Sequence, residues 1–397
     1  MDAHEPPLGC LAEHFSAALS AVPGRLHFAA HSHHPWPDVT LDAQRQAWTD
    51  AAVMLDDKWD HVFASVYPEA AGHLARELRL PGGEGLAFAP NTHSLVLRVL
   101  SLLPERPRIV TTDGEFHAFE RQARRLEEDG LCTVERVPTE PFDSFPERLV
   151  TEARRGADLV FFSQVFFNSG WRVPALDQLV AALPPGPLVV IDGYHGFLAT
   201  PTDLSAVCSR AFYVAGGYKY AMSGEGVCFL HAPPGVPWRP RDTGWFAAFG
   251  ALDRGAGSPG AVAYAPGGRA FLGATFDPTG LYRFNAVQRW RARVGLTTAA
   301  AEAWVHGLQR RFVEGLRRAG APGAPGPEAL VVPVEDPRRG HFLTFRTPEA
   351  RPWAARLKRV GVVTDARDDR LRVGFGVYHD EAAVDALVAR WTSLSGG

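Results

Sequence analysis

The feature that most constrains this chain is a pair of apolar segments that each lead into a polar side chain. The first, Val189 to Asp192, predicts a buried strand that ends in a carboxylate, and a turn holding His195 follows it. The second, Ala211 to Ala215, predicts a strand that runs into glycines and then Lys219. Short apolar runs bounded by glycine are typical of buried strands in a parallel sheet. Because polar groups gather at the carboxyl ends of such strands, we expect Asp192 and Lys219 to lie close together.

A carboxylate and an amine at neighbouring strand ends suit one cofactor, pyridoxal 5′-phosphate (PLP). Lysine holds this aldehyde as a Schiff base, which is the role predicted for Lys219. A carboxylate beside the pyridine nitrogen keeps the ring protonated and able to accept electrons, which is the role predicted for Asp192. Taken singly, each residue has an ordinary alternative, since aspartate often caps helices and lysine in a loop is usually solvated. Taken together with the flanking strands and glycines, they predict a PLP site.

The rest of the chain alternates short apolar runs with helical patterns. Further strands are predicted at residues 86–89, 108–112, 132–137, 159–163 and 227–230. Strands that alternate with helices are typical of an α/β fold, in which a mostly parallel sheet carries helices on both faces. The spacing of apolar residues also predicts one helix from Thr40 to about Tyr67.

A polar turn follows the strand predicted at residues 86–89. It reads Asn91-Thr92-His93-Ser94 and leads into a helical pattern. The unpaired N–H groups and the dipole of a helix N-terminus favour a bound phosphate, so Thr92, His93 and Ser94 are candidates to hold the phosphate of PLP. Ordinary helix capping by Asn91 or Thr92 is the alternative, and it needs no ligand.

Length and charge bound the organisation of the chain. At 397 residues it exceeds what one hydrophobic core usually supports, so two domains are expected. We place a large PLP-binding domain at residues 40–295 and a small α+β domain at residues 1–39 plus 296–397. The net charge of −3 argues against a generally basic nucleic-acid-binding protein. The sequence has neither a signal-peptide pattern nor eighteen consecutive apolar residues, so we expect a cytoplasmic protein without a membrane partner.

Histidines and cysteines give no strong metal signal. His31, His33 and His34 lie in one proline-bounded turn, but ligands that close together in an extended turn point in different directions. No metal site is therefore predicted, and a metal hydrolase built on these histidines stays an alternative. Four cysteines at positions 10, 132, 208 and 228 lack C-x-x-C spacing, which indicates reduced thiols.

The pattern Asp192-x-x-His195 followed by Tyr218-Lys219 resembles the class V aminotransferase group of fold-type I PLP enzymes, and within it the kynureninases. The run Tyr218-Lys219-Tyr220 before a glycine-rich turn is similar to theirs. The C-terminal segments RGHFLTFR, GVVTDAR and LRVGFGVYHD also resemble kynureninase segments. This resemblance implies a fold-type I architecture, with a mainly parallel sheet in the large domain. It also implies a homodimer whose subunits share their active sites.

The resemblance also implies roles for individual residues. Phe116 would stack on the PLP ring, with His117 as the fallback, while Trp245 and Thr275 would reach the phosphate bound by the other subunit. Arg372 would bind the substrate α-carboxylate, and the turn with Ser32 and His33 would lie at the mouth of the substrate pocket. The predicted cofactor-binding set is Lys219, Asp192, His195, Tyr218, His93, Ser94, Phe116, Trp245 and Thr275. Core packing for Phe116, interface packing for Trp245 and a surface position for Arg372 are the structural alternatives.

The activity implied first is kynureninase-like, the hydrolytic Cβ–Cγ cleavage of kynurenine to anthranilate and alanine. The chain departs from the kynureninases at the His31 to His34 turn and at Ala247-Ala248, near the expected site of the substrate side chain. Another PLP-dependent lyase or aminotransferase with a different amino-acid substrate is therefore an alternative, and a non-catalytic PLP-binding protein is a second. A cysteine desulfurase is disfavoured, because that group uses a nucleophilic cysteine in a loop beyond the lysine, whereas Cys228 lies on a predicted strand.

Overall fold

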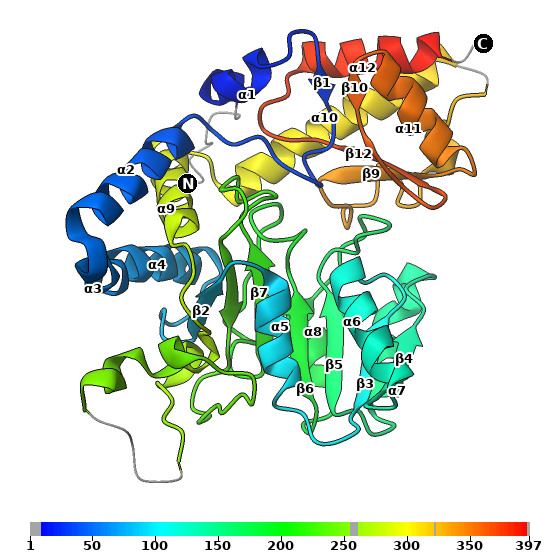
Figure 1. The fold of residues 1–397 in the computed structure, drawn as a ribbon. Coiled ribbons are helices and arrows are strands. Elements are labelled where there is room, and N and C mark those ends of the chain that lie inside the picture. Colours follow the sequence, from blue (N-terminus) through cyan, green and yellow to red (C-terminus); the bar gives the residue numbers. More distant parts are fainter. Residues whose placement is uncertain (1–8, 255–260, 321–322, 395–397) are drawn as a thin grey trace, which may run out of the picture.

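A seven-stranded sheet forms the centre of the protein, in a computed structural model that describes residues 9–254, 261–320 and 323–394 (Figure 1). Its strands, in spatial order, are β2 (Leu86–Ala89), β8 (Cys228–His231), β7 (Ala211–Gly216), β6 (Leu188–Asp192), β5 (Leu159–Ser163), β3 (Arg108–Thr112) and β4 (Thr133–Val137). The neighbouring strands β7, β6, β5, β3 and β4 run parallel to one another. Strand β8 is antiparallel to both of its neighbours, β2 and β7. The sheet is thus mainly parallel, as the sequence predicts.

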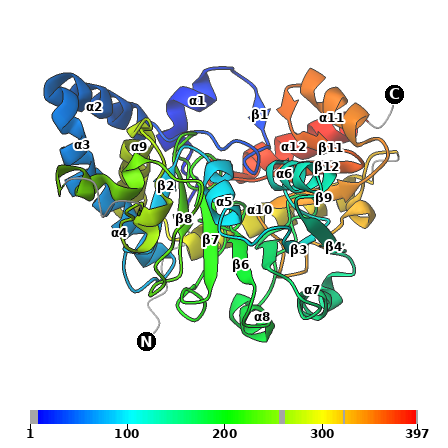
Figure 2. The same ribbon diagram turned by 60° about the horizontal axis from the view of Figure 1, so that its bottom comes forward.

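Helices cover both faces of this sheet. Figures 1 and 2 show α5 (Thr92–Leu100) and α6 (His117–Glu128) on one face, with α7 (Phe145–Ala153) and α8 (Leu176–Ala182) on the other. Each of these helices links two parallel strands. Right-handed crossovers explain why the helices divide between the two faces. The chain moves across the sheet in one direction from β2 to β4, which places α5 and α6 on one face, and then moves back from β4 to β6, which places α7 and α8 on the other.

A helical layer lies beside the β2 edge of the sheet. The prediction of one continuous helix from Thr40 to about Tyr67 is wrong. Leu55 has a φ of 50°, which no α-helix accommodates, so α2 (Val39–Met54) ends just before it. The segments of this layer are α2 (Val39–Met54), η2 (Leu55–Asp57), α3 (Lys58–His61), η3 (Val62–Val66), α4 (Tyr67–Glu77) and α9 (Thr279–Arg293). The long helix α9 packs against α2 and α4.

A second hydrophobic core lies in the C-terminal part of the chain. Its antiparallel sheet has the order β11 (Asp365–Arg367), β12 (Arg370–Gly374) and β9 (Phe342–Arg346). The helices are α10 (Thr298–Ala319), α11 (Ala350–Arg359) and α12 (Glu381–Ser393). Near the other end of the chain, β1 (Leu26–His27) pairs in parallel with β10 (Val362–Val363), so the N-terminal segment joins this unit.

Short helical turns connect these elements. They are η1 (Ala12–Phe15), α1 (Ser16–Ser20), η4 (Phe142–Ser144), η5 (Trp245–Arg254), η6 (Gly267–Phe271) and η7 (Pro327–Ala329). Within the described residues, none of the helices has the length and apolar character needed to cross a membrane.

The parallel register places three strand ends side by side. Ser163 of β5 pairs with Asp192 of β6, which in turn pairs with Val214 of β7. The turn after β6 and the loop after β7 therefore leave the sheet at the same edge. They carry His195 and Lys219 to one place, where the C-terminal unit also approaches (Figure 1).

Candidate active site

Lys219 is a buried amine surrounded by aromatic rings. Its side chain is only 4% exposed, and Nζ lies 2.9 Å from Nε2 of His195. Nζ also lies over the rings of Tyr194, Phe116 and Tyr218, at 4.7, 5.4 and 5.7 Å from their centroids. The structure thus brings together Lys219, His195, Phe116 and Tyr218, four residues predicted for the site.

The protonation of this cluster follows from its burial. Desolvation lowers the pKa of Lys219 to about 7, although the nearby Asp192 carboxylate works in the opposite direction. Burial likewise raises the pKa of Asp192, and Lys219 and the Tyr194 N–H oppose that shift. Burial and Lys219 both hold the pKa of His195 well below its ordinary value. At neutral pH, His195 is therefore uncharged, and a substantial fraction of Lys219 is the free amine that reacts with an aldehyde.

The donors and acceptors of the cluster fit PLP. Asp192 accepts one hydrogen bond, from the N–H of Tyr194 to Oδ1 at 2.9 Å, and no described residue donates to Oδ2. A carboxylate oxygen without a protein donor, beside a reactive amine, is what a protonated pyridine nitrogen requires. The face of Phe116 supplies an apolar surface for a planar ring.

The N-terminus of α5 lies where the phosphate site is predicted, and Asn91 caps it. Asn91 Oδ1 accepts hydrogen bonds from the Ser94 N–H at 2.8 Å and the Ser94 Oγ at 3.0 Å. The backbone of Thr92 lies close enough to Cys228, the first residue of β8, to lower the pKa of that thiol against the effect of burial. The capping alternative is therefore realised at Ser94, while the backbone of Thr92 and His93 is not used by this cap. The phosphate roles of His93 and Ser94 stay predictions.

Arg372 reaches the same cluster from the C-terminal unit. It is 2% exposed and lies on β12, and its guanidinium stacks on Phe167 and Phe342, 4.4 and 5.8 Å from their ring centroids. Phe167 in turn contacts Phe116 at 5.4 Å. Nη1 donates to the Phe167 carbonyl at 2.7 Å, Nη2 pairs with Asp365, and Nε has no partner. Arg372 is thus a fixed, buried cation near Lys219 and is not a surface residue.

The histidine turn after β1 also lies at the site, but its rings face different partners. His31 stacks on Phe342 at 4.7 Å and points Nε2 toward Asp365. His33 stacks on Tyr218 at 5.2 Å, and Ser32 lies beside it. The positions of Ser32 and His33 suit the mouth of a pocket over Lys219, although their role in substrate binding stays a prediction. Within the ranges that the structure covers, no group of three or more ligating side chains could hold a metal ion.

Trp245 and Thr275 pair with each other and not with the Lys219 cluster. The Trp245 indole N–H donates to Thr275 Oγ1 at 3.2 Å, and the Trp245 side chain is 43% exposed. Among the described contacts, none joins either residue to Lys219 or Asp192 of the same chain. Their predicted roles therefore depend on a second subunit.

Three residues that the sequence analysis did not assign also shape the site. Asp365 fixes Arg372; burial alone would raise the pKa of this carboxyl, but His31 and Arg372 hold it far below its usual range. Tyr194, two residues after Asp192, contacts Lys219. Glu115 joins the strand ends behind Asp192, because it accepts hydrogen bonds from the Thr112 and Ser163 side chains. Burial raises the pKa of Glu115 to about 8. Two sequence features could have indicated these residues: Tyr194 lies two residues after Asp192, and Glu115 directly precedes Phe116.

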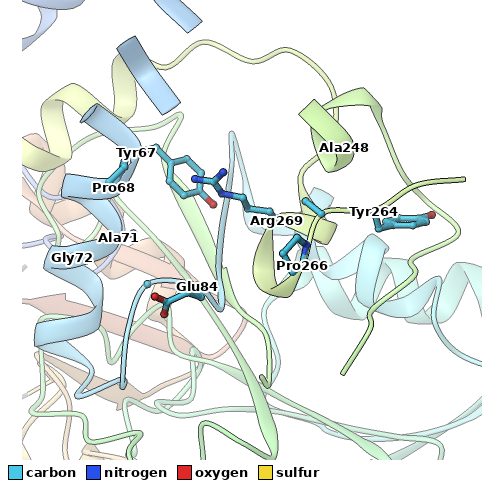
Figure 3. Close-up of a pocket in the computed structure, with 11 residues that line it drawn as sticks. Tyr67, Pro68, Ala71, Gly72, Glu84, Ala248, Tyr264, Pro266 and Arg269 are labelled. Atoms are coloured by element: carbon cyan, nitrogen blue, oxygen red, sulfur yellow. The ribbon is translucent and has the colours of Figure 1, made fainter. Parts of the chain in front are cut away.

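A separate cavity of about 790 Å³ lies away from this cluster (Figure 3). Tyr67 and Pro68 of α4 line one side, and Tyr264, Pro266 and Arg269 line the other. The Arg269 guanidinium stacks on Tyr67, 5.4 Å from its ring centroid. No residue predicted for the active site lines this cavity, so the cavity is not part of the candidate active site around Lys219.

The comparisons with known proteins agree with this geometry at the level of fold. No protein-family profile matches the sequence. The chain is 29% identical over 353 residues to isopenicillin N epimerase from Streptomyces clavuligerus, spanning 80% of this chain and 82% of that protein. It is 32% identical over 184 residues to the isopenicillin N epimerase of Amycolatopsis lactamdurans, spanning 41% of this chain and 45% of that protein.

Solved structures match nearly the whole chain. Apo cysteine desulfurase from Thermococcus onnurineus NA1 superposes with a TM-score of 0.78 at 16% identity, covering 100% of this chain and 99% of that one. The cystine C-S lyase C-DES gives 0.76 at 16% identity, with 94% and 98% coverage. A variant of that lyase, with glycine covalently linked to its PLP cofactor, gives 0.74 at 16% identity, with 95% and 98% coverage.

The chain has the class V aminotransferase-like fold of PLP-dependent enzymes. The predicted fold-type I architecture is therefore confirmed. The resemblance to class V proteins is confirmed as a shared fold, whereas the specific likeness to kynureninases stays a prediction.

The low pKa of Lys219 makes its reactivity testable. In protein dialysed against hydroxylamine to remove any bound aldehyde, reductive methylation of Lys219 should reach half its maximal rate near pH 7, because only the free amine reacts. Asp192→Asn should move this midpoint lower, since the Asp192 charge raises the pKa of Lys219. Peptide mass spectrometry measures the rate, and the exposed Lys358 on α11 reports reagent activity at each pH. A Lys219 rate that still rises steeply above pH 9 would contradict the assignment.

Proposed function

We propose that this protein is a PLP-dependent enzyme that moves a proton at the Cα of an α-amino acid. The observation that carries the proposal is the buried Lys219, with its pKa lowered to about 7, beside the open carboxylate oxygen of Asp192. When bound, PLP supplies an electron-accepting ring that stabilises negative charge at Cα. The PLP cofactors of proteins that share this fold support the proposal.

Lys219 and its neighbours would divide the work between them. Lys219 would anchor the cofactor and, once displaced by the substrate amine, would carry a proton to and from Cα. Asp192 would accept the pyridine N–H through its unpaired Oδ2. The neutral His195, 2.9 Å from Nζ, would orient the amine without adding a second positive charge. His195 would keep the contact that it already makes, and Asp192 would use an oxygen to which no described residue donates.

Arg372 is the proposed anchor for the substrate carboxylate. Asp365 and the Phe167 carbonyl each hold one nitrogen of the guanidinium, and two phenylalanine rings pack on its faces. Such a guanidinium has lost most of its freedom before substrate arrives, so little further entropy is lost on binding a carboxylate. The unpartnered Nε is a donor left for that purpose.

Epimerisation at Cα is the reaction best supported among the candidates. It requires removal of the Cα proton from one face and delivery of a proton to the opposite face; the amine of Lys219 would serve one face, and a second donor or water would serve the other. A relative that spans 80% of this chain is an isopenicillin N epimerase. Sulfur transfer of the desulfurase type is disfavoured, because burial raises the pKa of the nearby Cys228 thiol to about 11 and leaves it a poor nucleophile.

Kynurenine cleavage is the second candidate. The segments RGHFLTFR and GVVTDAR favour it, since they supply Phe342 and Asp365, which surround Arg372 at the site. His33 and Tyr218 stack at the rim, where an aryl group of the substrate would also pack. A class V transamination and PLP binding without turnover are further possible outcomes of the test below.

Exchange of the Cα proton tests the proposal. The PLP-loaded protein is incubated in D₂O with isopenicillin N, L-kynurenine and other L-amino acids, and deuterium at Cα is measured by mass spectrometry together with the enantiomeric ratio. Deuterium uptake with loss of stereochemistry is expected for at least one substrate, and Lys219→Ala should reduce the exchange rate by at least about a thousandfold. Lys358→Ala is the matched control and should exchange like the wild type.

The products separate the candidate reactions. Anthranilate would identify kynurenine cleavage, and a keto acid would identify transamination. A PLP-loaded protein whose exchange is the same in the wild type and in Lys219→Ala would overturn the proposal, because the proton would then not pass through this amine.

We also propose that the active form is a homodimer. Large apolar side chains are exposed on and after α2, where Trp48, Val53 and Leu55 are 75%, 75% and 68% exposed. The pair Trp245 and Thr275 is likewise outside the Lys219 cluster of its own chain. Both features are explained if a second copy covers α2 and receives Trp245 near its own site.

Sedimentation velocity tests the homodimer. The wild type should sediment as a dimer, and Trp48→Glu with Val53→Asp should shift it toward monomer because the charges would be buried in the interface. Leu131→Glu is the control, since Leu131 is also exposed, at 51%, but lies at the other side of the sheet near β4. A wild type that sediments as a monomer at micromolar concentration would contradict the proposal.

A further inference from the structure

Tyr194 occupies an unusual position between the predicted anchor points of the cofactor. It follows Asp192 by two residues, its backbone N–H donates to Asp192 Oδ1, and its side chain is 8% exposed. Its ring lies 4.7 Å from Lys219 Nζ and 4.9 Å from the ring of Tyr218. Tyr194 therefore contacts both Asp192, through its backbone, and Lys219, through its ring.

A glycine at the end of β7 makes room for this phenol. A Cβ on Gly216 would lie 2.3 Å from Tyr194 Oη and 2.4 Å from Cys228 Sγ, so no larger residue fits there without displacing one of them. The hydroxyl therefore extends past the end of β7, toward β8. A glycine is therefore required at position 216 for the Tyr194 side chain to adopt this position.

The hydroxyl ends beside the N-terminus of α5. Oη lies 3.5 Å from Cys228 Sγ, which is a weak hydrogen-bond partner. The backbone N–H groups of Gly217 and of Thr92, the first residue of α5, lie near the same sulfur and work against the rise that burial causes in the pKa of the Cys228 thiol. The buried phenol thus lies near the N-terminus of α5 with a thiol and the Tyr218 phenol as neighbours, and the described hydrogen bonds give its Oη no carbonyl or carboxylate acceptor.

We propose that Tyr194 is a cofactor-binding residue, whose ring forms a wall of the slot for the PLP ring and whose Oη donates a hydrogen bond to the PLP phosphate. This inference rests on the proposed function. A phosphate at the α5 N-terminus would give both Oη and the Thr92 N–H the charged acceptor that they lack. Burial raises the pKa of Tyr194 well above its ordinary value, so the phenol keeps its proton and stays a donor throughout the neutral range.

Binding of PLP and of pyridoxal separates the two contributions of Tyr194. Pyridoxal carries the same ring and aldehyde but no phosphate, so only PLP should use the hydroxyl. In absorbance titrations of the cofactor-free protein, Tyr194→Phe should weaken PLP binding by about tenfold or more and leave pyridoxal binding unchanged. Inorganic phosphate, used as a competitor for PLP, should lose potency in Tyr194→Phe by a similar factor.

Tyr67→Phe is the matched control for loss of a buried phenol hydroxyl. Tyr67 Oη donates to the Leu86 carbonyl at 2.6 Å, and Tyr67 lines the separate cavity of Figure 3. This variant should bind PLP and pyridoxal like the wild type. Pyridoxal binding by Tyr194→Phe also shows that the variant is folded.

The outcomes distinguish this inference from the proposed function. Equal PLP affinity in Tyr194→Phe and the wild type would overturn the inference alone, and so would equal losses for PLP and pyridoxal, because the phosphate would then not be the acceptor. A wild type that takes up no PLP would instead overturn the proposed function itself.

Discussion

The burial of Lys219 beside Asp192 is the constraint on which the rest of the site depends. An amine and a carboxylate that leave water both become less stable as ions, which is why the pKa of Lys219 falls and that of Asp192 rises. The parallel register of β6 and β7 holds the two residues at one buried edge of the sheet, so the chain cannot relieve the desolvation cost by moving either group into water. A partly neutral amine at neutral pH is the chemical result.

The surroundings of this pair limit the charge at the site. His195 and His31 are buried, and burial lowers the pKa of each, so both are neutral near pH 7. Arg372 then carries the fixed positive charge next to Lys219, and Asp365 balances it. In the proposed function, a substrate carboxylate would bind to this one cation, while the amine of Lys219 would remain free for proton transfer. On this proposal, the C-terminal unit would supply the carboxylate anchor and the central sheet would supply the acid–base group.

Part of this arrangement could be predicted from the sequence. The alternation of apolar runs with helical patterns was sufficient for the mainly parallel sheet, and the short spacing between Asp192 and Lys219 was sufficient to place both at one edge. Long-range contacts were less accessible, since the stacking of Phe342 and Phe167 on Arg372 joins segments that are far apart in the chain. The end of α2 was missed because a positive φ at Leu55 contradicts its helical periodicity. The predicted roles of Trp245 and Thr275 would need a second chain, which one sequence cannot position.

The central claim is that Lys219 carries the cofactor, and the most direct measurement is the site of covalent attachment. The purified protein is incubated with PLP, reduced with borohydride, digested and mapped by mass spectrometry. The chain has lysines only at positions 58, 219 and 358, so each possible site falls in a distinguishable peptide. We predict that the reduced cofactor is found on the peptide that contains Lys219. Attachment confined to Lys58 or Lys358, or no attachment at saturating PLP, would contradict the account.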